Sequence, residues 1–447
     1  MPADLLIRGG LLVTPAGLWR GDVAVEGGIV TQVAPEVSAG AREVLDARGL
    51  HVMPGLIDVH VHFNEPGRSS WEGLASGSAA LAAGGGTTFC DMPLNSHPPL
   101  LTPADFHDKC EAAAKASITD FALWGALTPK NLQLLPDLAE CGVVGFKAFM
   151  CDSGIPEFET ADDLTLLEGM QVAAELGLPV AVHAESEALT AALTHRARTW
   201  GGRSAGDVLE SRPSISELEA VQRALLFAQE TRCDLHFVHL SCHKAVELIK
   251  EARARGVSVT CETCPHYLHF NAKDFERLGA TLKCAPPLRS EEERRALWRA
   301  VTAGDVDLIA SDHSPCPPEM KDEADMFAAW GGVNGVQSTL NVLLEHRLDV
   351  GKIAHLTAHR PADRFRLTRK GPIQPGTDAD LALIDLSKRT ALTNQSLLTR
   401  HQTSPYLGEA LAGRVVRTLV RGRTVFKDGK VAASPCGRLV RPARREH

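Results

Sequence analysis

The 447-residue chain has few aromatic residues, no surplus of basic charge and no long apolar run. Lys and Arg number 47 against 55 Asp and Glu, so a basic surface for nucleic acid is not expected. No segment reaches the roughly 20 apolar residues that a membrane-spanning helix needs. The amino-terminal residues show no signal-peptide pattern. We therefore expect a cytoplasmic protein with no nucleic-acid or membrane partner.

The cysteines give no sign of a disulfide framework. They number 11, an odd count, and are scattered along the chain, which favours a reducing compartment. Cys261 and Cys264 have the spacing of half a zinc ribbon, but no second pair lies at the required distance. We interpret both as structural residues.

The two ends of the chain share one texture, in which short apolar runs alternate with glycine-containing turns. Residues 5–10 and 22–30 show it at the amino end, and residues 379–385 and 415–430 show it at the carboxyl end. Neither end is large enough to bury a good core alone. We expect residues 1–53 and 367–447 to form one composite β-sandwich domain.

Residues 54–366 alternate strand-like and helix-like segments. Helices are expected at 102–116, 161–176, 214–230, 243–254 and 291–303, with Thr102 and Ser214 as N-caps. Eight such strands separated by helices predict a (β/α)8 barrel, with a doubly wound sheet as the alternative because a sequence does not show closure. The eight expected strands are 56–62, 87–91, 120–126, 143–149, 179–183, 235–239, 257–262 and 307–311.

The first of these strands ends in His60-Val61-His62. Alternate residues of a strand face the same side, so both imidazoles point together while Val61 points away. Two such side chains are able to hold one metal ion. A bare His-x-His pair usually arises by chance, so the metal interpretation requires further ligands.

Further ligand-type residues occupy other strands of the predicted barrel. Lys147 lies within the fourth strand, His183 and His239 end the fifth and sixth, and Asp312 follows the eighth. Each alone has an ordinary structural explanation. Barrel enzymes build their sites at the carboxyl ends of the strands, so the convergence of four His and one Asp predicts a metal centre.

Lys147 decides how many ions this centre holds. A charged lysine in a buried strand is costly unless an acid at the barrel rim pairs with it, and an ammonium would repel a metal. Carbamylation by CO2 would give it two oxygens and a negative charge, which two dications among neutral imidazoles need. We expect one ion on His60, His62 and Asp312, a second on His183 and His239, and carbamylated Lys147 bridging them.

Five segments resemble, in order, landmarks of the cyclic amidohydrolases of the amidohydrolase superfamily, which include dihydroorotase, dihydropyrimidinase (hydantoinase) and allantoinase. The resemblance covers nearly the whole chain. It implies that Lys147 is the carbamylated lysine and Asp312 the catalytic aspartate, that the two divalent ions are Zn²⁺, although manganese, cobalt and iron also fit, and that the chain forms a homotetramer. The segments are residues 54–62, 145–150, 182–185, 262–268 and 311–315.

Three loops bear on the substrate. Asn64 stands where dihydroorotases carry an arginine that grips a carboxylate, and Asp152 stands where hydantoinases carry a tyrosine. Residues 64–73, 91–96 and 151–154 resemble allantoinases instead. We expect opening of the neutral ring of allantoin to allantoate, in ureide catabolism. The polar side chains expected to bind its ureido arm, unless they only cap their loops, are Asn64, Asn95 and Ser153.

The resemblance also implies a mechanism. Hydroxide held between the two ions attacks the ring carbonyl, and Asp312 takes its proton and passes it to the leaving nitrogen. Hydantoinase is the second candidate activity and dihydroorotase the third. An inactive scaffold is the non-enzymatic alternative, which the six filled ligand positions argue against.

Overall fold

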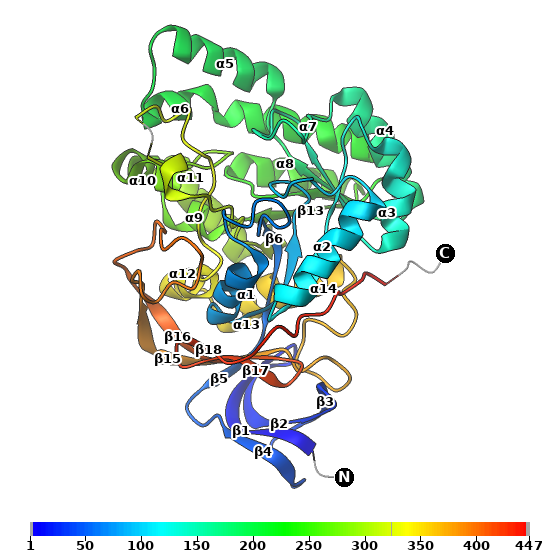
Figure 1. Cartoon of the computed structure of the whole chain (residues 1–447), viewed down its shortest axis with the longest axis vertical. Coiled ribbons are helices and arrows are strands. Elements are labelled where there is room, and N and C mark those ends of the chain that lie inside the picture. Colours follow the sequence, from blue (N-terminus) through cyan, green and yellow to red (C-terminus); the bar gives the residue numbers. More distant parts are fainter. Residues whose placement is uncertain (1–2, 323, 444–447) are drawn as a thin grey trace.

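The computed structural model describes residues 3–322 and 324–443, and its centre is a ring of short parallel strands (Figure 1). One sheet contains three of them, β6 (Leu56–Val61), β7 (Gly86–Asp91) and β8 (Asp120–Leu123). A second sheet contains β9 (Gly125–Ala126), β10 (Phe146–Phe149), β11 (Val180–His183), β12 (Leu235–Phe237), β13 (Val259–Thr263) and β14 (Leu308–Ile309).

Two junctions close these sheets into a barrel. β8 and β9 are one strand interrupted at Trp124, whose amide donates to Asp91 O at 3.1 Å. At the other side, Val61 and His313 form a parallel bridge, and the amide of His62 donates to His313 O at 2.8 Å. The predicted (β/α)8 barrel is thus confirmed, and the doubly wound alternative is excluded.

Helices cover the outside of the barrel. Thr102 caps α2 in a capping box, as predicted, whereas Ser214 is the first residue of α7 and Pro213 takes the cap position. None of the described helices is long and apolar enough to cross a membrane. The barrel helices are α1 (Leu74–Ala83), α2 (Pro103–Ala116), α3 (Leu135–Cys141), α4 (Asp163–Glu175), α7 (Ser214–Thr231), α8 (His243–Ala254) and α11 (Glu291–Ala303).

The other helices fill the remaining connections. The pair α5 and α6 follows β11 and stands at the end of the molecule farthest from the chain termini (Figure 1). Their bounds, with those of the others, are α5 (Glu187–Thr199), α6 (Ala205–Ser211), α9 (Pro265–His269), α10 (Ala272–Leu278), α12 (Thr339–Glu345), α13 (Val350–Ala354) and α14 (Arg360–Arg364).

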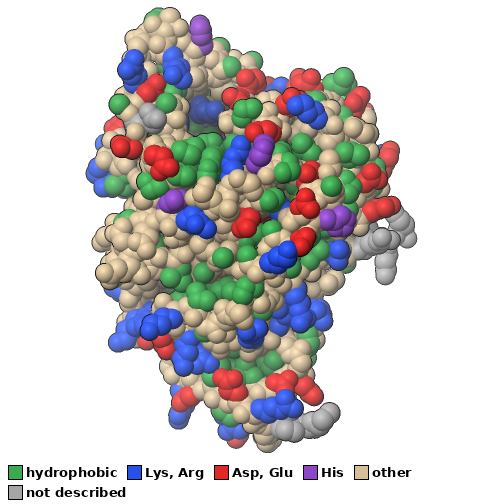
Figure 2. Space-filling view, in the orientation of Figure 1, with side chains coloured by type: hydrophobic (Ala, Val, Ile, Leu, Met, Phe, Trp, Pro, Cys, Tyr) green, Lys and Arg blue, Asp and Glu red, His purple; other side chains and the backbone are tan. Residues whose placement is uncertain are grey.

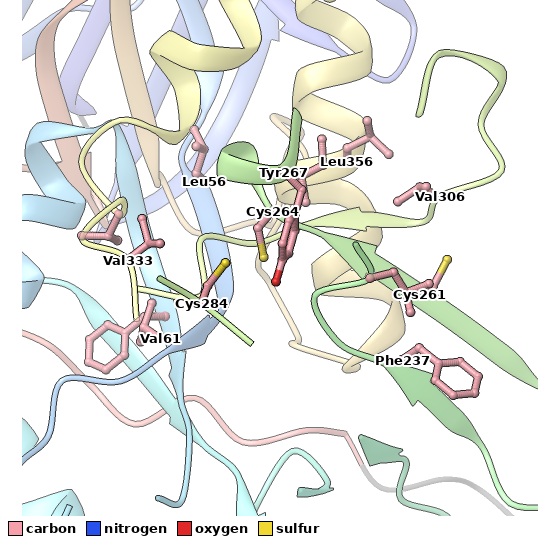
Figure 3. Close-up of a cluster of buried hydrophobic side chains, with 14 of the residues drawn as sticks. Leu56, Val61, Phe237, Cys261, Cys264, Tyr267, Cys284, Val306, Val333 and Leu356 are labelled. Carbon is pink, nitrogen blue, oxygen red and sulfur yellow. The ribbon is translucent and has the colours of Figure 1, made fainter. Parts of the chain in front are cut away.

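The main core lies between the barrel strands and their helices. Leu56 and Val61 of β6 and Phe237 of β12 belong to it (Figure 3). Cys261 and Cys264 are buried in the same cluster, and none of the 11 cysteines, all of which are described, forms a disulfide. Their burial in the core agrees with the interpretation of Cys261 and Cys264 as structural residues.

Both ends of the chain build one nine-stranded sheet below the barrel (Figure 1). Its halves join where β5 pairs antiparallel with β15, and Lys and Arg side chains gather over it in the lower part of Figure 2. The predicted limits of the two domains stay a prediction. The strands are β1 (Ala3–Thr14), β2 (Gly17–Glu26), β3 (Ile29–Ala34), β4 (Ala41–Asp46), β5 (His51–Pro54), β15 (Leu381–Ala391), β16 (Ala410–Val420), β17 (Arg423–Lys427) and β18 (Lys430–Val431).

A buried ion cluster joins this sheet to the base of the barrel. Lys370 Nζ lies 2.6 Å from Asp120 Oδ2, at the start of β8, and 2.6 Å from Asp380 Oδ2, just before β15. It also lies 2.9 Å from Asp378 Oδ2. Burial would lower the pKa of Lys370, but the three carboxylates raise it above its usual value. The ammonium therefore occupies the centre of this carboxylate group.

Replacing Lys370 by Met should destabilise the protein by about 3–5 kcal/mol, because three buried carboxylates would lose the cation at their centre. Urea unfolding followed by circular dichroism measures the change. Lys388→Met, at an exposed position of β15, is the matched control and should leave the unfolding midpoint in place. An unchanged midpoint for the Lys370 variant would show that the cluster does not stabilise the joint.

Candidate metal centre

A cavity of about 420 Å³ opens at the carboxyl ends of the barrel strands. The predicted His and Asp ligands all contribute to its wall, although they come from strands far apart in sequence. They share this wall with residues of the loops that follow the strands. The five ligand-type residues in the lining are His60, His62, His183, His239 and Asp312.

His60, His62 and Asp312 form the first ligand group. Nε2 of His60 lies 3.3 Å from Asp312 Oδ1, and Nε2 of His62 lies 3.5 Å from the same oxygen. Burial would raise the pKa of Asp312, but the two imidazoles hold it below its usual range. An ionised carboxylate and two imidazole nitrogens so close together are suited to a divalent ion.

His183 and His239 form the second group. Nδ1 of His183 lies 3.0 Å from Nε2 of His239, and both side chains are buried. Burial lowers the pKa of both imidazoles, most strongly that of His239. Neutral imidazoles are the form that binds a metal, so two nitrogens directed at one another mark a second place for a cation.

Lys147, on β10, lies within electrostatic range of Asp312 in the first group and of His183 and His239 in the second. Its side chain is fully buried, and Nζ has no hydrogen-bond partner among the described residues. Nζ lies 4.9 Å from the centre of the Phe149 ring. Burial lowers the pKa of Lys147 to about 7. No carboxylate at the rim pairs with it in the described part of the chain.

Two buried glutamates orient the histidines. Glu262 Oε1 contacts His60 Nδ1 at 2.5 Å, and its other oxygen contacts His236 Nε2 at 3.1 Å. Burial would raise the pKa of Glu262, but these imidazoles hold it at about 2. A carboxylate on the far nitrogen fixes the ring and its tautomer. No role for Glu262 was predicted from the sequence. Its contacts with His60 on β6 and His236 on β12 become visible only when the strands are placed in the barrel.

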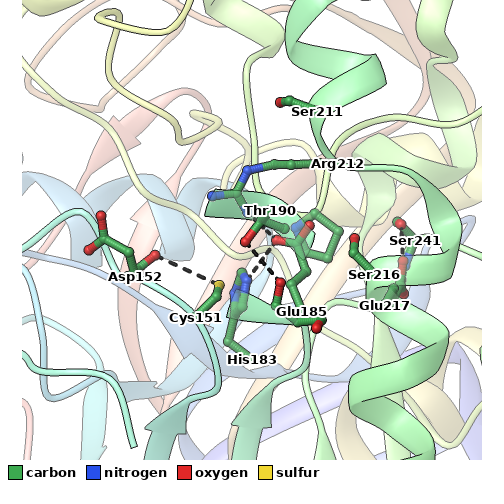
Figure 4. Close-up of polar contacts among 12 residues, drawn as sticks. Cys151, Asp152, His183, Glu185, Thr190, Ser211, Arg212, Ser216, Glu217 and Ser241 are labelled. Atoms are coloured by element: carbon green, nitrogen blue, oxygen red, sulfur yellow. Dashed lines mark hydrogen bonds and ion pairs between the residues drawn. The ribbon is translucent and has the colours of Figure 1, made fainter. Parts of the chain in front are cut away.

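The second glutamate belongs to a longer network (Figure 4). Glu185 Oε2 lies 2.8 Å from His183 Nε2 and also accepts a hydrogen bond from Arg212 Nη1. Burial would raise the pKa of Glu185, but Arg212 and His183 lower it to about 2. The position of Glu185, two residues after the candidate ligand His183, is the sequence signal that could have indicated this contact.

The three predicted substrate contacts have different surroundings. Asn95 and Ser153 line the cavity, but the Ser153 hydroxyl contacts backbone groups of Ile155 and Phe158, as a loop cap does. Asn64 does not line the cavity. It is fully buried with φ of 64°, a left-handed conformation that asparagine tolerates, and its Nδ2 lies 3.4 Å from Pro315 O.

The remaining wall comes from residues that the sequence analysis did not single out. Arg198 of α5, Arg212 after α6 and Lys283 bring positive charge to it, and residues 327–332 supply a continuous stretch of lining. Asp152, which stands where hydantoinases carry a tyrosine, also lines the cavity, as does Ala285. The site therefore has residues able to hold a metal at the strand ends, and basic side chains together with the stretch 327–332 in the rest of its wall.

The model of the amidohydrolase family matches residues 51–425. The chain is 52% identical to an allantoinase of Deinococcus radiodurans, with 99% of each chain covered, and 39% identical to one of Escherichia coli, with 95% of this chain and 96% of the relative covered. Among solved structures it resembles the L-hydantoinase (dihydropyrimidinase) of Arthrobacter aurescens, with a TM-score of 0.96, 34% identity, and 98% of this chain and 100% of that chain covered.

Proposed function

The chain belongs to the amidohydrolase family, and from that premise we propose that it is a metal-dependent hydrolase that opens the ring of allantoin to give allantoate. The observation that carries the proposal is the convergence of four histidines and Asp312 on one cavity, with Lys147 buried nearby, in a chain matched over nearly its full length by allantoinases. The family is metal-dependent, and the buried His and Asp groups suit metal ions.

We propose that the cavity holds two divalent ions, with zinc as the expected metal. His60, His62 and Asp312 would hold one, and His183 and His239 the other. Support comes from the ligand distances of 3.3 and 3.5 Å in the first group and 3.0 Å in the second. Two divalent ions in such a site make a water acidic and polarise a carbonyl oxygen.

Lys147 would join the two groups as a carbamate. In that reaction the neutral amine attacks the carbon of CO2, an N–C bond forms, a carbon–oxygen electron pair moves onto oxygen, and the amine releases one proton. The lowered pKa of about 7 leaves much of the amine neutral at physiological pH. The added carboxylate would remove the anomaly of a buried nitrogen with no hydrogen-bond partner among the described residues.

Asp312 is the proposed proton carrier. Its carboxylate lines the cavity beside the two imidazoles and is held ionised, so it is ready to accept a proton from the attacking water. It would then deliver that proton to the ring nitrogen as the amide bond breaks. Glu262 and Glu185 keep the neighbouring imidazoles in fixed orientations during this transfer.

Hydantoinase activity is the second candidate. It is favoured by the structural likeness to the L-hydantoinase of Arthrobacter aurescens, but the identity is 34% against 52% for the Deinococcus allantoinase. Asp152, which is exposed and lines the cavity, stands at the position where the resemblance places the tyrosine of hydantoinases. We also propose that the chain forms a homotetramer, on the family resemblance. We propose a cytoplasmic location because none of the 11 cysteines, all described, forms a disulfide.

Purified holoenzyme should turn over allantoin with a higher kcat/KM than hydantoin, dihydrouracil or dihydroorotate. The reason is that a cationic, backbone-lined cavity mouth offers hydrogen bonds to a ureido arm, which the other three rings lack. Initial rates of ring opening for the four compounds, at matched metal content, measure the preference. A higher kcat/KM for hydantoin would replace the first candidate by the second.

Asp312→Asn should lower kcat by about 10²–10⁴-fold, because an amide cannot carry the proton to the leaving nitrogen. Most of the metal should remain, since both imidazole groups are intact. Steady-state kinetics and metal analysis by atomic emission check both parts. Asp428→Asn is a matched control in a turn with φ of 49°, where asparagine is tolerated, and should leave kcat unchanged. Near-normal turnover of the Asp312 variant would refute its role.

Lys147→Ala should lose metal together with activity, because the proposed bridge between the two ligand groups disappears. A short-chain acid such as acetate should restore part of both by supplying a carboxylate in the vacated space. Metal content and turnover, with and without acetate, are the measurements. Lys244→Ala, exposed on α8, should behave as wild type. Full metal content without any acetate effect would contradict the carbamate.

A further inference from the structure

One wall of the cavity is a stretch of six consecutive residues, 327–332, here named the wall segment. It contains no helix or strand, so no regular backbone ladder holds it in shape. A cavity wall of this kind needs other restraints if it is to present its backbone groups to a substrate in one fixed arrangement.

Two lysines supply those restraints. Lys321 Nζ donates to Trp330 O at 2.9 Å, to Gly332 O at 2.7 Å and to Ala280 O at 2.7 Å, which uses all three of its hydrogens. Burial lowers the pKa of Lys321 to about 8. The ammonium thus ties the end of the wall segment to the short helical turn at residues 279–282.

Lys283 holds the beginning of the same segment. Its Nζ donates to Phe327 O at 3.0 Å and also to Ala329 O, and its backbone carbonyl accepts a hydrogen bond from Gly332 N at 2.7 Å. Unlike Lys321, Lys283 itself lines the cavity. Four of the six carbonyls of the wall segment therefore accept hydrogen bonds from the two ammonium groups.

The two residues before the wall segment, and Phe327 at its start, contact α5 and the loop that follows it. Arg198 Nη2 lies 3.2 Å from Asp325 Oδ2, and its guanidinium lies 5.7 Å from the centre of the Phe327 ring. The amide of Met326 donates to Arg203 O at 2.8 Å. The two lysines thus hold the carbonyls of the segment, while α5 contacts its first residue and the residues just before it.

We propose that Lys283 and Lys321 are positioning residues for substrate selection, which hold the wall segment where it meets the ureido arm of allantoin. The inference rests on the proposed function. The reacting ring would lie at the strand-end ligands, and its arm would reach the wall segment, which lines the same cavity and whose backbone groups offer hydrogen bonds. A ring without the arm makes little use of this wall, so the lysines would affect allantoin and leave hydantoin nearly unchanged.

The test compares Lys321→Met, Lys283→Met and wild-type holoenzyme on allantoin and on hydantoin. We expect KM for allantoin to rise about tenfold or more in each variant, with kcat within about threefold and metal content unchanged, because the lost interaction concerns binding of the arm. For hydantoin, kcat/KM should stay within about threefold. Lys321→Arg, which keeps the charge and the donors, should recover most of the affinity for allantoin.

Lys352→Met is the matched control, since this exposed lysine also donates to a backbone carbonyl, Thr302 O, outside the cavity lining. It should leave both substrates unaffected. Hydrogen exchange of peptides covering residues 324–332 should be faster in Lys321→Met than in wild type. If Lys321→Met does not fold, Lys283→Gln at the cavity surface carries the same kinetic test.

Two failures are distinguishable. A wild-type enzyme that does not hydrolyse allantoin contradicts the proposed function itself. A wild-type enzyme that does so, while the lysine variants keep its KM for allantoin or lose allantoin and hydantoin turnover equally, contradicts the positioning role alone. Loss of metal in the lysine variants would likewise overturn it, because the effect would then arise at the ligands.

Discussion

Barrel closure is the constraint on which the site depends. The hydrogen bond from the amide of His62 to the carbonyl of His313 joins the first strand to the end of the last. The amide of Ser311 also donates to Asp58 Oδ1. Together, the two contacts place Asp312 beside His60 and His62, although about 250 residues separate them in the sequence. Because every strand is parallel to its neighbours, the carboxyl ends all reach the same rim. The ligands thus converge through backbone geometry before any of them contacts a metal.

Burial sets the charge states around this rim. It keeps the imidazoles of His183 and His239 neutral and lowers the pKa of the Lys147 amine to about 7. The carboxylates resist the same effect only where cationic or polar partners surround them, as Arg212 does for Glu185. The site therefore contains neutral imidazoles, ionised carboxylates and the Lys147 amine, which has no hydrogen-bond partner among the described residues. This arrangement favours cations at its centre.

Much of this site was predictable because its sequence signals are local. A His or Asp at the end of an apolar run indicates both the strand and the direction of the side chain, so His60, His183, His239 and Asp312 were found together with the barrel. The glutamates behind the histidines were not assigned roles, since the contact between Glu262 and His60 crosses strands far apart in sequence. Asn64 was expected to bind substrate but does not line the cavity. Its left-handed backbone conformation is not evident from the sequence of its loop.

The less regular parts were harder to predict because they have no local pattern of apolar residues. Helices α5 and α6 carry mixed polar and apolar residues, with Thr190 alone buried within α5, and so lack a clear apolar stripe. The wall segment has no periodic pattern at all, and its conformation depends on lysines whose hydrogen bonds go to carbonyls rather than to acids. Such restraints leave no spacing signal in a single sequence.

The pairing of β5 with β15 has a consequence for synthesis on the ribosome. The amino-terminal strands emerge first, and β5 is able to pair with β1 at once, yet its other neighbour, β15, follows only after the entire barrel has been made. Throughout translation the early strands therefore present an open sheet edge, which is prone to pair with other chains. The last strands made complete the structure begun by the first, so a nascent chain interrupted before β15 would carry an unprotected edge, whatever the state of its barrel.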